Sequence, residues 1–114
     1  MAVDNHLAAV HFRVEMAGQS LEHAIMFLGS RRMFQGRMRL QEAITDLQHA
    51  SAYLQKSGKY PNLAAYVGAL IVFYRGELVK VLRPGVAPMV AEELYGAQGK
   101  LLAADPILTP SAAN

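Results

Sequence analysis

The four histidines are the side chains in this sequence best suited to metal binding or acid–base chemistry. A di-iron helical bundle requires paired Glu-x-x-His elements together with further inward-facing carboxylates. The sequence holds one loose analogue, Asp46-x-x-His49, and no second one. His6 and His11 do not share a helix face, and Glu15, four residues after His11, is as easily its partner in a surface pair. We therefore expect no metal site and no cofactor.

Nucleophilic catalysis lacks its usual sequence contexts. The chain has no cysteine, and none of its serines lies in a nucleophile elbow. No glycine-rich loop of the P-loop or dinucleotide-binding type is present. Glu92 and Glu93 are adjacent, so on a helix they point to different faces and do not form a catalytic pair. We expect a protein that is not an enzyme.

The strongest charged feature is a cluster of four arginines within nine residues, at Arg31, Arg32, Arg37 and Arg39. Met33, Phe34 and Met38 lie between them. Interleaved arginines and aromatic rings can bind phosphates and stack on bases, or grip an acidic partner helix. The simplest explanation is a solvated corner, with Arg31 and Arg32 at the negative end of a helix. A protein partner ranks second and nucleic acid third, because four charges without a helix-turn-helix pattern are few.

Length and composition indicate one folded domain. The chain has 114 residues, of which 53% are hydrophobic and 18% charged, and its net charge is +2. These values exclude an intrinsically disordered protein, and the lack of cysteine excludes a disulfide framework. The first residues do not resemble a signal peptide, and the apolar stretch from Leu63 to Tyr74 is too short to span a bilayer. We expect a cytoplasmic protein with no membrane span.

Apolar residues recur at helical spacing in four segments, and no segment alternates with the period of a strand. We expect helices over residues 5–32, over 37–57, from Asn62 to Arg83 and from Ala87 to Pro106. Asp4 is the expected N-cap of the first helix, and Gly58 and Pro61 end the second. Short connections predict antiparallel neighbours, hence an all-α, antiparallel four-helix bundle. The single domain spans residues 1–114, with a loose tail from about residue 106.

Two features suggest that this domain binds something. Five glycines fall inside predicted helices, where each costs about 0.8–1 kcal/mol relative to alanine: Gly18, Gly68, Gly76, Gly96 and Gly99. Close helix crossing is the preferred explanation, and a groove for a partner helix is the other. The large apolar side chains also exceed what one inward stripe per helix can hold: Met26, Phe27, Met33, Phe34, Tyr53, Tyr66, Phe73 and Tyr95. We expect the chain to bind another protein or itself.

Three segments resemble the flagellar export chaperones that bind flagellin. Residues 21–28 resemble the signature of the family's first helix, with Leu21 and His23 where the family has tyrosine and glycine. Residues 42–47 resemble the second helix, and Asn62 to Leu78 the third. The fourth helix matches in pattern alone. The family's N-terminal threonine–alanine–serine–proline element is absent, which leaves its N-terminal cap without a counterpart here.

The resemblance, which covers about residues 20–104, implies a non-enzymatic chaperone. Such a protein holds a helix-forming segment of an export substrate in apolar grooves and keeps it from premature assembly. We expect the partner-binding residues to be Met26, Met33, Phe34, Tyr66, Phe73, Tyr74, Arg37 and Arg39. Two alternatives remain open: a self-associating structural bundle that forms a homodimer, and a small nucleic-acid-binding adaptor that uses the Arg31–Arg39 cluster.

Overall fold

Helices make up most of residues 4–109, which is the part of the chain that the computed structural model describes. They are α1 (Asn5–Gly29), α2 (Met33–Ser57), α3 (Pro61–Val81), α4 (Ala87–Gly96) and α5 (Gln98–Ala103). Residues 4–109 contain no strand, which confirms the all-α class. The molecule is an elongated body with extents of 49 × 19 × 19 Å.

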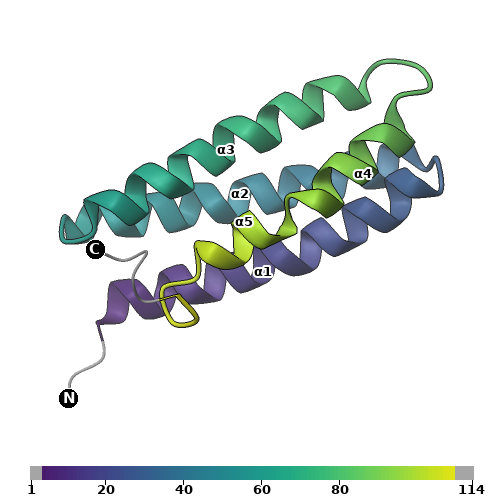
Figure 1. The fold of residues 1–114 in the computed structure, drawn as a ribbon. Coiled ribbons are helices and arrows are strands. Elements are labelled where there is room, and N and C mark those ends of the chain that lie inside the picture. The colour runs from purple at the N-terminus through teal and green to yellow at the C-terminus, as the bar shows by residue number, and fades with distance from the viewer. Residues whose placement is uncertain (1–3, 110–114) are drawn as a thin grey trace.

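The long helices run lengthwise and reverse direction at each link (Figure 1). α1 and α2 pack against each other along much of their length, α3 packs chiefly on α2, and α4 packs on α1. α3 meets α4 at far fewer places. The α1–α2 link and the α3–α4 link therefore lie at the same end of the molecule, on the right in Figure 1.

One apolar core joins all five helices. Its members follow the predicted stripes at three- and four-residue spacing, as in Leu21, Ala24 and Leu28 on α1 and Leu40, Ile44 and Leu47 on α2. The predicted end signals also hold at two sites. Asp4 accepts hydrogen bonds from the backbone N–H groups of His6 and Leu7, and Gly58 adopts a left-handed φ of 67° after α2.

The turn between α1 and α2 is tighter than the sequence predicts. The first helix ends at Gly29 rather than residue 32, and α2 begins at Met33 rather than residue 37. Arg31 takes a left-handed φ of 62° in between, and the Arg32 N–H donates to the Phe27 carbonyl at 2.8 Å. Gly36 lies inside α2, where a Cβ would stand 2.4 Å from Cδ2 of Leu28. This close approach lets α2 start four residues early.

The predicted fourth helix is interrupted. It divides at Ala97 into α4 and α5, with Gly96 and Gly99 beside the break. Two glycines within four residues weaken helix propagation. α3 also differs from the prediction, because it starts at Pro61, and a proline suits the first turn of a helix. α5 nevertheless continues in the same general direction as α4 (Figure 1).

The segment after α5 is hydrogen-bonded as far as residue 109, within the tail that the sequence predicts to be loose from about residue 106. Asp105 and Pro106 are buried. The Thr109 hydroxyl lies 2.7 Å from the Ala103 carbonyl oxygen and 2.6 Å from that of Asp105, so it can donate to either. The remainder of the predicted tail, residues 110–114, lies outside the described part of the chain.

α3 exposes much of its apolar surface. Among the described helices it alone has the length and composition to cross a membrane, a test that the core helix of a folded protein also passes. Only 33% of the most apolar 18-residue segment of α3 is buried. Val72 and Val79 point outward with 70% and 60% of their surface exposed. The outer face of α3 is therefore apolar except for the exposed Arg75, and it has no neighbour within residues 4–109.

Close helix crossing does not explain the helix glycines. A Cβ on Gly68, Gly76, Gly96 or Gly99 would meet no described atom within 4 Å, and one on Gly18 would stand 3.9 Å from Leu101. The preferred explanation from the sequence is therefore wrong for four of the five glycines. The residue that does allow a close approach is Gly36, which the sequence placed in a link.

Gly76→Ala should raise the free energy of unfolding by about 0.5–1 kcal/mol, because the methyl group enters open space and alanine favours the helix. Gly36→Ala should lower it by about 1–3 kcal/mol, because Leu28 must move. Urea unfolding followed by circular dichroism measures both. A loss of stability in Gly76→Ala would show that something covers the outer face of α3.

Candidate functional site

A groove between the start of α2 and the end of α3 brings exposed apolar side chains together with the arginine cluster. We call it the α2–α3 groove. It has a volume of about 380 Å³ and is lined by Phe34, Arg37, Met38, Gln41, Glu42 and Leu78. Phe34 and Met38 are 70% and 50% exposed. The sequence analysis singled out Phe34 and Arg37 as partner-binding residues, and the fold places both in this groove.

Helical spacing explains how the α2–α3 groove forms. Phe34, Met38 and Gln41 follow one face of α2, while Leu40, Ala43, Ile44 and Leu47 form its buried face. Leu78 and the exposed Leu82 lie one turn apart at the end of α3. Leu78 packs partly against the core, whereas Phe34, Met38 and Leu82 remain exposed, so another molecule must cover these three if they are to be buried.

The charges around this groove are unbalanced. Arg39 forms an ion pair with Glu42 at 3.1 Å, which neutralises the one carboxylate in the groove wall. Within residues 4–109, no ion pair involves Arg31, Arg32, Arg37 or Arg83. Because Arg37 lines the groove and forms no ion pair among residues 4–109, its guanidinium is available to a bound anion.

A second groove, which we call the α3–α5 groove, holds two more predicted residues. Its volume is about 300 Å³, and its lining consists of Tyr66, Ala69, Leu70, Phe73 and Lys100. The Tyr66 hydroxyl donates to the Lys100 carbonyl at 2.9 Å, and the Lys100 ammonium stands 5.5 Å from the centre of the Phe73 ring. These contacts join α3 to α5, so Tyr66 and Phe73 already have partners within the fold.

A buried carboxyl group links α3 to α4. Glu77 is 3% exposed, and the Lys80 ammonium donates both to its Oε1 at 3.1 Å and to Glu93 Oε2 at 2.9 Å. Burial, then hydrogen bonding with Glu93, raises the pKa of Glu77, and these effects exceed the opposite effect of Lys80. The hydrogen bond with Glu77 lowers the pKa of Glu93. Glu77 is thus the member of the pair that holds a proton more readily.

Tyr74 is not a surface residue, and its predicted role in partner binding is wrong. Its side chain is 0% exposed and belongs to the inward stripe of α3 with Leu70 and Val81. Burial raises the pKa of its phenol to about 12. Its neighbour Phe73 points toward α5. The rings of Phe73 and Tyr74 pack edge-on, with their centroids 5.3 Å apart.

The remaining predicted residues do not converge on one site. Met26 is exposed on α1 and lines neither groove, whereas Met33 is partly buried against the core. Arg39 contacts Glu42 rather than standing free. Met38, Leu78 and Leu82 were not singled out for binding, although the exposure of Met38 follows from its place opposite the apolar face of α2.

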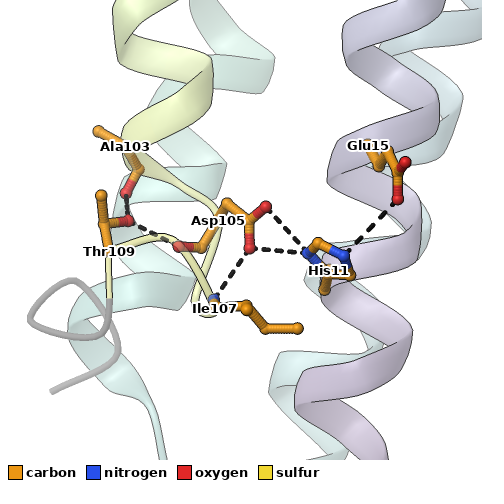
Figure 2. A network of polar contacts seen from close by, with 6 residues as sticks. All are labelled: His11, Glu15, Ala103, Asp105, Ile107 and Thr109. Carbon is orange, nitrogen blue, oxygen red and sulfur yellow. Dashed lines mark hydrogen bonds and ion pairs between the residues drawn. The ribbon is translucent and has the colours of Figure 1, made fainter.

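His11 lies in a polar network that fastens the C-terminal segment to α1 (Figure 2). Its Nδ1 is 2.9 Å from both carboxylate oxygens of Asp105, which also accepts a hydrogen bond from the Ile107 N–H. The expected pair with Glu15 is longer, at 3.6 Å from Nε2. Among residues 4–109, no three histidine or acidic side chains are grouped to hold a metal ion. The network joins the chain after α5 to α1.

No match to the chain was found among family models, curated proteins or solved structures. The resemblance to flagellar export chaperones thus remains a prediction from the sequence segments that carry it.

Tyr74→Phe should leave the free energy of unfolding unchanged or slightly higher, because the phenol oxygen is buried without a hydrogen-bond partner in the described structure. Tyr74→Ala should lower it by about 3–5 kcal/mol, because it opens a cavity in the core. Urea unfolding of both variants measures the difference. A loss of more than about 1 kcal/mol in Tyr74→Phe would mean that the hydroxyl has a partner.

Glu77→Gln should change how stability depends on pH. A carboxyl group whose pKa is raised on folding adds stability that is complete below its unfolded pKa, near 4.5, and is lost as the pH rises through the folded value. The wild type should therefore lose stability relative to Glu77→Gln as the pH rises above 4.5 through the raised pKa of Glu77. Thermal unfolding at a series of pH values measures this difference, with Glu92→Gln, an exposed site on α4, as the control. Parallel curves for wild type and Glu77→Gln would contradict it.

Proposed function

We propose that this chain is a non-enzymatic adaptor or chaperone that binds a helical segment of a partner protein. In this proposal α4 and α5 act as one interrupted rod, so that the fold is an antiparallel four-helix bundle. The observation that carries the proposal is the α2–α3 groove, where Phe34 and Met38 remain exposed although the core is complete without them. Isolated apolar side chains are common on protein surfaces, whereas a contiguous apolar groove is typical of an interaction site.

The shape of the groove favours a helix as its occupant. Two neighbouring helices line the groove with apolar side chains: Phe34 and Met38, one turn apart on α2, and Leu78 on α3. An amphipathic helix offers anchors at the same spacing, so its ridge can lie between these walls. Met38 adds a flexible side chain that can adjust to different anchors. A secreted, flagellar-type subunit is one partner of this kind, and the family resemblance supports it.

Self-association is the second candidate function, and the outer face of α3 favours it. Small and apolar residues recur there at alternating four- and three-residue spacing, at Ala65, Ala69, Val72, Gly76 and Val79. This is the spacing with which two helices pack side by side. The absence of a side chain at Gly76 would let a second copy of α3 approach closely.

The combination Phe34→Ser with Met38→Gln should weaken binding of an amphipathic helix by about tenfold or more, because it removes both exposed anchors of α2. The ligand is taken from a displayed library of helical peptides with a fixed apolar stripe, selected on the full chain. Fluorescence anisotropy then measures the Kd. The matched control, Tyr95→Ser with Met89→Gln, removes similarly exposed groups from α4 and should change the Kd less than twofold.

Two results would contradict this assignment. If no peptide is enriched, the α2–α3 groove does not bind helices. If light scattering shows a homodimer that Val72→Glu converts to a monomer, and enriched peptides ignore the change at Phe34 and Met38, the outer face of α3 is the functional surface and the chain is a self-associating bundle.

A further inference from the structure

The α2–α3 groove has a charge as well as a shape. We infer that its partner is an acidic amphipathic helix, in which glutamates or aspartates flank the apolar stripe; this inference rests on the proposed function. Arg37 forms part of the groove wall beside Phe34 and Met38. Its guanidinium has no acidic partner among residues 4–109. A helix that enters the groove therefore passes directly beside an uncompensated cation.

Three acidic side chains at this end of the molecule are already engaged, whereas Glu92 forms no ion pair in the described structure and lines a separate pocket with Gly29, not the α2–α3 groove. Glu42 is paired with Arg39, and Glu77 and Glu93 share Lys80. Arg31, Arg32, Arg37 and Arg83 are the cations near this end that form no ion pair in the described structure. They belong to the start of α2 and to the two links that meet at the same end (Figure 1). Arg75, farther back along α3, and Lys56, Lys59 and Lys100, nearer the opposite end, form none either. Charge complementarity therefore favours a partner that brings carboxylates to this end.

Arg31 strengthens this argument because it occupies an unfavourable backbone conformation. Its φ of 62° is left-handed, and glycine is the usual residue where a helix ends in this way. The chain instead places a long cation there, two residues before the first residue of α2. Strained positions of this kind are found preferentially at binding and catalytic sites.

An acidic helix fits the surface better than a nucleic acid does. Nucleic-acid binding depends on many phosphate contacts, and four unpaired arginines supply few. A sugar–phosphate backbone would also leave Phe34, Met38 and Leu82 without apolar contacts. An amphipathic helix satisfies both features, since its apolar stripe enters the groove while its carboxylates accept paired hydrogen bonds from arginine.

The test uses the same peptide library, with every polar position encoded as Glu, Gln or Lys. Selection on the wild-type chain should enrich Glu over Lys beside the apolar stripe. The affinity of an enriched acidic peptide should fall as salt is added, because exposed charges are screened. Arg31→Gln combined with Arg37→Gln should raise its Kd about five- to tenfold. Circular dichroism confirms that this variant folds, and Arg83→Gln provides an independent second variant.

The matched control is Lys56→Gln with Lys59→Gln, which removes the same charge near the opposite end of α2 and should change the Kd less than twofold. Enriched peptides that are rich in Gln or Lys, yet still lose affinity with Phe34→Ser and Met38→Gln, would overturn the acidic helix and leave the proposed function intact. A library without any enriched peptide would remove both. Arginine-dependent binding of a DNA duplex or of phosphatidylglycerol vesicles, without enrichment of acidic peptides, would also overturn the inference.

Discussion

The packing of Leu28 against Gly36 determines the geometry of the end of the molecule where the α2–α3 groove lies. Because position 36 has no side chain, the last turn of α1 and the first turn of α2 can approach closely, and the link between them shortens to three residues. That short link holds Arg31 in a left-handed conformation and starts α2 at Met33. The early start gives α2 the extra turn that presents Phe34 and Arg37 to the groove.

The position of α3 also depends on helix packing, here against α2 and against α4 with α5. Its sequence is apolar nearly all round, so burial is decided by where its neighbours stand rather than by residue type. α2 covers one flank, and α4 with α5 covers the other at fewer places. The inward stripe, with Tyr74 as its largest member, fills the core; Leu78 and Phe73 then fall on opposite flanks and line the two grooves.

Local periodicity was sufficient to predict the helices, whereas tertiary contacts decided the details of the site. The leucine stripes and the roles of Asp4 and Gly58 are encoded within a few residues. The sequence predicts Gly36 in a link. In the structure Gly36 is helical, because its packing against Leu28 outweighs its low helix propensity. Phe73 and Tyr74 are adjacent and similar, so their different environments depend on the rotation of α3. The contact between His11 and Asp105 joins residues 94 positions apart and has no sequence signal.

Several residues of this chain are poor choices for an isolated, maximally stable monomer. Arg31 adopts a backbone conformation suited to glycine, Gly76 interrupts an open helix face, and Phe34 exposes an aromatic ring. Natural proteins hold such unfavourable residues where a local gain in stability would conflict with binding. Arg31 and Phe34 lie beside the α2 wall of the groove, whereas Gly76 is two residues from Leu78 and therefore on a different face of α3. A helix bound in the groove would account for Arg31 and Phe34, whereas the open side of Gly76 would be covered only by a molecule on the outer face of α3.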